Sequence, residues 1–131
     1  PDQVDARRIL DIAKHSLAGE MALRSGKAGE SVTHFEAAKT IEDQILYNEP
    51  PLWYYPVRES LGQAYLAAGR AADAERVYQE DLKLFPGNVW SLRGLAAAQT
   101  VQGKTAEAAK TGAALKQAAA KSDVTLSASR F

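Results

Sequence analysis

The sequence contains few residues that could carry out acid–base or metal chemistry. Its 131 residues include only two histidines, His15 and His34, and no cysteine, which excludes disulfides and thiolate metal sites. Two histidines with an acid such as Glu20 or Glu36 could bind a metal ion, but an HExxH pattern is absent and the two histidines are not paired at an i, i+4 spacing. Because isolated histidines are usually packed or solvated, we predict no metal site and no bound cofactor.

Carboxylates and hydroxyl groups form no clearer catalytic pattern. Glu42-Asp43 and Glu80-Asp81 are sequence neighbours, so in a helix their side chains point to different faces and are expected to be solvated. The chain has neither a GxSxG nucleophile elbow nor a Gly-rich phosphate loop. We therefore predict that the protein is not an enzyme.

Composition and charge exclude other classes of function. Sixteen basic residues balance sixteen acidic ones, and no basic stripe of the kind found in nucleic-acid-binding proteins occurs. No apolar run approaches the length of a membrane span. The chain begins at Pro1, so any targeting segment is expected to lie outside it. We expect a soluble domain, cytoplasmic or periplasmic, with its own core.

A repeat organises the second half of the chain. The segments Glu59–Pro86 and Arg93–Ala120 align so that Gly69 matches Gly103, and each aligned pair is 34 residues apart. Small residues at other matched positions would let paired helices approach closely. Each of the two glycines would end a helix in the left-handed conformation.

The central copy resembles the tetratricopeptide repeat, whose pattern is W-x₂-L-G-x₂-Y, then A-x₃-F, then P. The corresponding residues here are Leu61-Gly62-x₂-Tyr65, Ala74-x₃-Tyr78 and Pro86. Arg58 occupies the leading aromatic position. In the next copy Gln99 and Gly112 replace the aromatic residues, as expected of a degenerate terminal repeat.

A third copy lies upstream, with Gly19 and Phe35 at the internal offsets of Gly62 and Tyr78. Gly19 and Gly62 are 43 residues apart rather than 34, and seven of the nine extra residues lie between Phe35 and Pro50. Seven residues are close to two helical turns. We therefore predict that the second helix of this copy is extended without rotation of its apolar face.

These patterns predict an all-α superhelix, or solenoid, of about three helix pairs in a single domain spanning residues 1–131. The first copy covers about 3–49, the second about 55–87 and the degenerate third copy 88–121, followed by a tail at 122–131. The last amphipathic helix should run from about Thr105 to Ala120. The resemblance further suggests the C-terminal part of a larger bacterial tetratricopeptide protein.

A joint rich in proline and aromatic residues, at 48–56, separates the first two copies. Pro50 and Pro51 prevent the long helix from continuing, and Pro56 suits the first turn of the next one. The aromatic residues between them either cover the end of the long helix or form a lip that binds a ligand. These residues are Trp53, Tyr54 and Tyr55.

The resemblance implies a concave groove, lined by the first helix of each pair, that holds a partner peptide or helix. The alignment places these residues in the groove: Ser16, Glu20, Arg24, Glu59, Gln63, Asn88, Trp90 and Arg93. Trp90 with Arg93 most resembles a binding hot spot, although packing of Trp90 against the preceding helix pair is an equal alternative. Two acids, Glu20 and Glu59, would repel a carboxylate tail and favour a mixed or basic peptide.

We therefore expect a protein–protein interaction module that binds a protein or peptide, without a nucleic-acid partner, membrane span or cofactor. This expectation rests on the resemblance to the repeat family, whose members commonly bind partner proteins. One alternative is a structural C-terminal cap or a homodimer formed through the aromatic joint. A less favoured alternative is a small-molecule or metal-binding domain centred on His15 and His34.

Overall fold

The computed structural model describes residues 3–48 and 56–129, with side-chain surroundings for 6–45 and 56–122. These residues form six helices, and no strand occurs among them. The prediction of an all-α protein is therefore confirmed. The chain divides into two compact units, Pro1–Arg70 and Ala71–Phe131.

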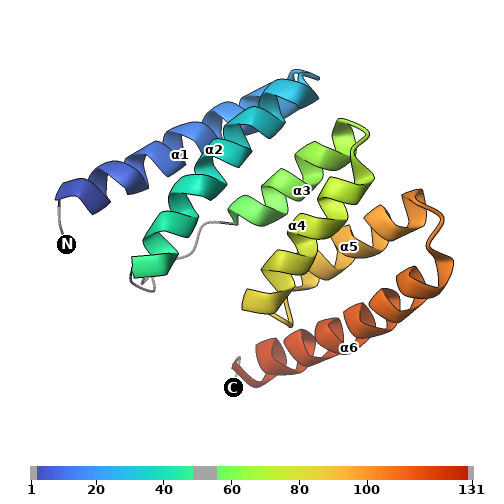
Figure 1. Cartoon of the computed structure of the whole chain (residues 1–131). Helices are drawn as coiled ribbons and strands as arrows, with labels where there is room; N and C mark the ends of the chain where they lie inside the picture. Colours follow the sequence, from blue (N-terminus) through green and yellow to red (C-terminus); the bar gives the residue numbers. More distant parts are fainter. Residues whose placement is uncertain (1–2, 49–55, 130–131) are drawn as a thin grey trace. The chain divides into compact units, whose positions relative to one another are not determined.

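The first unit contains α1 (Gln3–Arg24), α2 (Ala28–Asn48) and α3 (Val57–Ala67). Helices α1 and α2 lie side by side and run in opposite directions, and α3 contacts both of them (Figure 1). Pro56 stands immediately before α3, where its missing N–H group costs no helical hydrogen bond.

The second unit contains α4 (Ala71–Leu84), α5 (Val89–Val101) and α6 (Thr105–Ser129). Helix α5 contacts both α4 and α6 (Figure 1). Helix α2 has 21 residues and α4 has 14, which is the difference in length expected from the insertion upstream of Pro50. Helix α6 continues to Ser129, beyond its predicted end at Ala120, so much of the predicted tail is helical.

Turns of the same conformation follow α1, α3 and α5. The central residues of these turns, Gly26, Gly69 and Gly103, each have a φ angle of 76°. After α3, the N–H of Arg70 donates to the carbonyl of Tyr65 at 2.8 Å, and the turns after α1 and α5 contain the equivalent bond. This Schellman arrangement needs a left-handed residue, which glycine adopts without steric cost. The three glycines therefore determine where these helices end.

Two other glycines let aromatic rings pack directly against a helix backbone. A Cβ atom at Gly19 in α1 would lie 2.7 Å from the ring of Phe35 in α2. At Gly94 in α5, a Cβ atom would overlap the ring of Tyr78 in α4. Both rings are almost completely buried. The repeat alignment identifies Gly19 as a close-packing position but does not identify Gly94.

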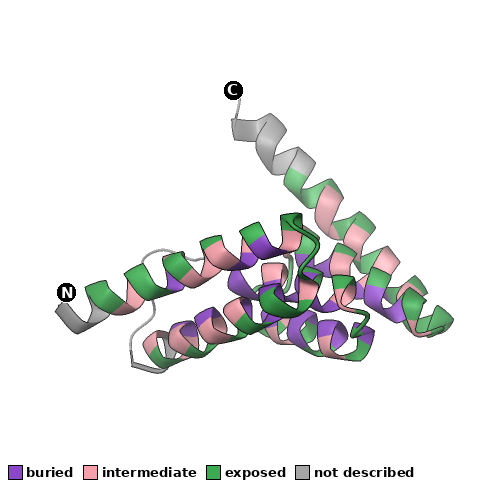
Figure 2. Cartoon of the chain, turned by 90° about the horizontal axis from the view of Figure 1, so that it is seen from above, coloured by how far each residue is buried: buried purple, intermediate pink, exposed green. Residues whose placement is uncertain are grey.

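The extension of α2 supplies apolar surface for the other two helices of the first unit. Ile12, Ala38 and Val57 form a buried cluster that joins α1, α2 and α3. Ile41 and Ile45, in the second half of α2, pack against this cluster. Figure 2 shows how buried and exposed residues alternate along the helices, so that each helix covers its neighbours with one side. The added turns of α2 therefore belong to the core.

A buried ion pair accompanies these apolar contacts between α2 and α3. Arg58 is 6 % exposed and Glu42 is 4 % exposed, and Nη1 of Arg58 lies 3.4 Å from Oε1 of Glu42. The other terminal nitrogen of Arg58 pairs with Asp43. The prediction that the Glu42-Asp43 pair is solvated is therefore wrong for Glu42. The prediction fails because one long guanidinium can reach two adjacent carboxylates when a second helix packs over them.

A second polar network joins α4 to the start of α5. Asp81 is completely buried, and it accepts hydrogen bonds from Oγ of Ser91 at 2.6 Å and Nδ2 of Asn88 at 2.8 Å. The side-chain oxygen of Asn88 accepts a bond from the backbone N–H of Trp90 at 3.1 Å, which caps α5. The prediction of a solvated Asp81 is therefore wrong, because Asp81 holds the cap of the next helix.

A third network ties α4, α5 and α6 together around Glu75, which is buried. Its carboxylate accepts hydrogen bonds from Nζ of Lys104 at 2.7 Å and from Nε2 of Gln102 at 3.1 Å and of Gln99 at 3.4 Å. Gln99 in turn accepts a bond from the hydroxyl of Thr111 at 2.7 Å. The Lys104 bond is the main cause that lowers the pKa of Glu75, against the opposing effect of burial, and the same bond raises the pKa of Lys104.

The close contact at Gly94 predicts a steric effect on stability. We expect Gly94→Ala to destabilise the protein by about 1–3 kcal/mol, because the new methyl group overlaps the buried ring of Tyr78. The matched control is Gly112→Ala in α6, where a Cβ atom meets open space. That change should be neutral or should stabilise the helix by up to about 1 kcal/mol. Urea unfolding of both variants tests this, and equal stabilities would contradict the packing described.

The Glu75–Lys104 pair predicts a dependence of stability on pH. A lowered pKa on Glu75 stabilises the fold above its ordinary value of 4.5, and this contribution is lost as the pH falls through the lowered pKa. A raised pKa on Lys104 stabilises the fold below its ordinary value of 10.5, and this is lost as the pH rises through the raised pKa. The pair therefore contributes fully between about pH 4.5 and 10.5.

We expect Glu75→Gln to remove part of the loss of stability that wild type suffers on acidification. Melting temperatures measured from neutral pH down to pH about 3 would show a flatter profile for this variant. Glu36→Gln, at an exposed position in α2, serves as the control and should keep the wild-type profile. Parallel profiles for wild type and Glu75→Gln would argue against this assignment.

Candidate functional site

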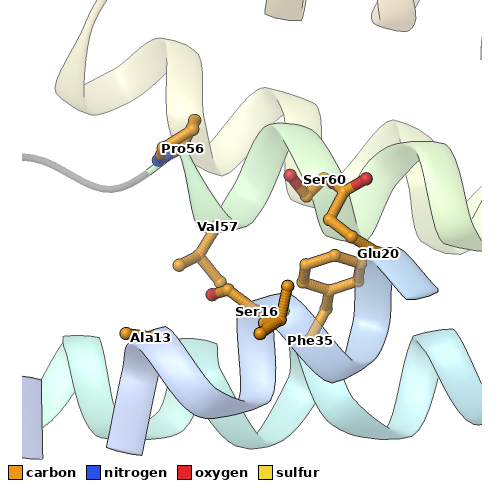
Figure 3. Close-up of a pocket in the computed structure, with 8 residues that line it drawn as sticks. Ala13, Ser16, Glu20, Phe35, Pro56, Val57 and Ser60 are labelled. Atoms are coloured by element: carbon orange, nitrogen blue, oxygen red, sulfur yellow. The ribbon is translucent and has the colours of Figure 1, made fainter. Parts of the chain in front are cut away.

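A pocket of about 300 Å³ lies within the first unit, between α1 and α3 (Figure 3). Helix α2 contributes one residue to it, the start of α3 contributes two, and Pro56 immediately before α3 contributes another. The lining residues are Ala13, Ser16, Leu17, Glu20, Phe35, Pro56, Val57 and Ser60. A volume near the lower end of the range for ligand sites suits one or two side chains better than a large cofactor.

The pocket is apolar over most of its surface. The ring of Phe35 reaches it from α2 because Gly19 leaves no side chain in the way, and the ring is only 1 % exposed. Val57 is equally buried and belongs to the core cluster of the first unit. Leu17 is 63 % exposed, so it forms an open edge. The pocket therefore has a rigid apolar floor and an accessible side.

Three polar groups interrupt this apolar surface. The hydroxyl oxygen of Ser16 is buried and has no hydrogen-bond partner. Among the described residues, no hydrogen bond or ion pair engages the side chains of Glu20 and Ser60. Figure 3 shows the Glu20 side chain reaching from α1 toward Ser60 in α3. Since buried polar atoms are normally satisfied, the Ser16 hydroxyl is an exception, and the half-buried Glu20 and Ser60 side chains lie beside it in the same pocket.

Only some of the groove residues predicted in the first unit line this pocket. Glu20 lines it, as does Ser16. Arg24 is exposed in the last turn of α1, and Glu59 and Gln63 of α3 do not line the pocket. Ser60 lines it instead, and sequence reasoning missed this residue. Ser60 lies one helical turn after Val57, so the two residues share the face of α3 that meets the pocket.

The predicted groove residues of the second unit take different roles. Trp90 is 65 % exposed, so most of its side-chain surface faces solvent. The guanidinium of Arg93 lies over the Trp90 ring at 5.2 Å from its centroid, within the range of a cation–π interaction. The side chain of Asn88 caps α5 by accepting a hydrogen bond from the N–H of Trp90, and it donates another to Asp81. Asn88 therefore has a structural role.

The predicted aromatic lip, formed by Trp53, Tyr54 and Tyr55, lies outside the described residues. Whether these aromatic residues cover the end of α2 or bind a ligand therefore stays a prediction. The residues on either side, α2 up to Asn48 and α3 from Val57, are those that the proline positions predict.

The two histidines meet across the α1–α2 contact. Their Nδ1 atoms are 3.2 Å apart and their ring centroids 5.5 Å apart. Within the described ranges, no group of three or more His, Cys, Asp or Glu residues is placed to hold a metal ion. Neither Glu20 nor Glu36 therefore completes the three-ligand site considered from the sequence.

Comparison with known proteins adds no assignment, because no protein-family model and no curated protein matches this chain. None of the helices formed by the described residues combines the length and the apolar character that crossing a bilayer requires. The chemistry of the pocket and of the exposed side chains is therefore the basis for proposing a function.

Two serines with different surroundings give a test of the pocket. Ser16→Ala should leave stability unchanged or raise it slightly, because the hydroxyl that it removes has no partner. Ser31→Ala should cost about 1 kcal/mol, because the buried Ser31 hydroxyl donates to the carbonyl of Gly19 at 2.8 Å. Both serines lie in helices, so the gain in helix propensity is similar in both variants. Equal losses in urea unfolding would mean that Ser16 does have a partner.

Proposed function

We propose that this domain binds a segment of a partner protein at the pocket between α1 and α3. The observation that carries this proposal is a set of unpartnered polar groups, on Ser16, Glu20 and Ser60, within an otherwise apolar and open pocket. Ligand sites commonly combine apolar walls with a few polar groups that orient the ligand.

The pocket favours a lysine or arginine side chain of the partner. The aliphatic part of such a side chain would pack against Leu17, Val57 and Phe35, and its cationic end would meet the carboxylate of Glu20. The hydroxyls of Ser16 and Ser60 can accept further hydrogen bonds from the cation. An acidic ligand is disfavoured, because Glu20 has no neighbouring cation within the pocket lining.

A tetratricopeptide-like solenoid is the architecture that we propose for this binding site. Three left-handed glycine turns at matching offsets, and the longer α2, support the internal alignment of the repeats. The pocket lies between α1 and α3, which are the first helices of successive copies in that alignment. In the family that the sequence resembles, those helices line the surface that holds a partner peptide.

Trp90 and Arg93 provide a second surface for contact with a partner, on the second unit. Tryptophan and arginine are enriched among residues that dominate binding energy, and a tryptophan with 65 % exposure leaves a large apolar area in water. The stacked guanidinium restricts the ring before binding, which lowers the entropy lost on contact. We propose that the two residues act as one anchor.

A binding role fits the pocket better than catalysis. Its lining offers one carboxylate and two hydroxyls, without a histidine, lysine or cysteine to form a nucleophile–base pair. Self-association is the second candidate. Leu10, Leu17 and Met21 are all more than half exposed on α1, and an apolar patch of this kind also suits a second copy of the chain.

Selection from a library of random peptides tests the proposed function. Peptides enriched on the purified domain should share a lysine or arginine. Their affinity, measured by fluorescence anisotropy, should fall about tenfold or more in Glu20→Gln, because a hydrogen-bonded charge contributes about 1.5–3 kcal/mol. The control variant, Glu36→Gln, removes an exposed acid outside the pocket and should bind as wild type does.

Two results would overturn the proposal. One is enrichment of peptides without a cationic residue, and the other is equal binding by Glu20→Gln and Glu36→Gln. Analytical ultracentrifugation at low and high protein concentration distinguishes self-association, the second candidate function, from binding of a partner peptide. A mass that doubles with concentration, together with no enriched peptide, would support self-association instead.

A further inference from the structure

We propose that His15 and His34 bind one divalent transition-metal ion, such as Zn²⁺, through their Nδ1 atoms. These atoms lie 3.2 Å apart on adjacent helices of the first unit. Two nitrogen ligands about 2.0–2.1 Å from a tetrahedral Zn²⁺ are themselves separated by about 3.3 Å. The two imidazoles thus already have the spacing of one edge of a tetrahedral site.

The surrounding packing holds the two rings in place. His15 lies one helical turn before Gly19, and His34 immediately precedes Phe35, so both are next to the closest contact between α1 and α2. The hydrogen bond from Ser31 to the carbonyl of Gly19 fixes the same contact. Both histidines are half-buried, so an ion can reach them from solvent. Binding requires rotation of the rings but no movement of the helices.

The present contact between the rings is compatible with a metal ion at the position of the shared proton. A direct Nδ1–Nδ1 hydrogen bond requires one nitrogen to carry a proton and the other to accept it. A metal ion needs both Nδ1 lone pairs, so the protonated ring must move its proton to Nε2. In a neutral pair this is a change of tautomer with no net release of protons. The metal ion then takes the place of the shared proton.

The site would be open rather than closed. Because no third His, Cys, Asp or Glu joins the pair within the described residues, water or an external ligand must complete the coordination. Neither histidine lines the pocket between α1 and α3. The metal proposal and the peptide proposal therefore rest on different residues, and either one can fail without the other.

Calorimetric titration with ZnCl₂, using protein without a polyhistidine tag, is the first test. We expect one ion to bind per chain. The melting temperature should rise with Zn²⁺ concentration and return to its metal-free value after addition of EDTA. His15→Ala and His34→Ala should each abolish both effects, with folding of the variants verified by circular dichroism. Full Zn²⁺ binding by either variant would overturn the proposal.

A second measurement on the wild-type protein covers the case in which a variant does not fold. The imidazole ¹⁵N resonances of both histidines should shift on addition of Zn²⁺, with the largest change at Nδ1 of each ring. Co²⁺ should give the visible absorption of a bound, low-symmetry ion. Unchanged resonances at millimolar Zn²⁺, or a change at one histidine alone, would show that the pair is only a structural hydrogen bond.

Discussion

The contact between the Phe35 ring and the backbone of Gly19 is the constraint on which the first unit depends. It sets how closely α1 and α2 approach, because any side chain at position 19 would occupy the place of the ring. Because of the same contact, the Phe35 ring forms the floor of the pocket and His15 lies near His34. One small residue therefore determines the helix spacing, the pocket and the histidine pair together. Such dependence is typical of close-packed interiors, which transmit small changes in volume.

Buried polar networks provide the specificity that small apolar residues cannot provide. A chain rich in alanine has many nearly equivalent ways to pack its helices, whereas a buried charge or amide accepts only a few partners. Arg58 and Gln99 stand where the resembled repeat has aromatic residues, and each is buried with polar partners on another helix. Loss of one partner would leave an uncompensated buried group, which is strongly destabilising. The departures from the repeat pattern therefore have a structural reason.

The same residue type serves stability in one place and is available for binding in another. Ser31 and Ser16 both come from helices of the first unit, but only the hydroxyl of Ser31 has a protein partner. Asn88 and Trp90 show a similar contrast at the start of α5, since Asn88 is engaged by the helix cap and Trp90 stays largely exposed. Candidate binding residues are those whose polar or apolar surface the fold leaves unused.

The helices and most of their ends follow from the sequence, except that α6 continues past Ala120 to Ser129. Apolar spacing, the glycines of the three turns and the prolines at 50, 51 and 56 act over a few residues, so they can be read locally. The greater length of α2 also follows from counting residues between matched positions. The repeat alignment also placed Ser16 and Glu20 among the groove residues, and both of them line the pocket.

Which polar groups are buried with partners, and which are left without them, depends on contacts between distant parts of the chain. Glu42 meets Arg58 sixteen residues later and Glu75 meets Lys104 twenty-nine residues later, and no local pattern connects such positions. Gly94 and Ser60 were missed for the same reason, since their importance depends on a ring or a helix that approaches from elsewhere in the chain. Helix formation is governed by neighbours in sequence, whereas desolvation and partner choice are governed by neighbours in space.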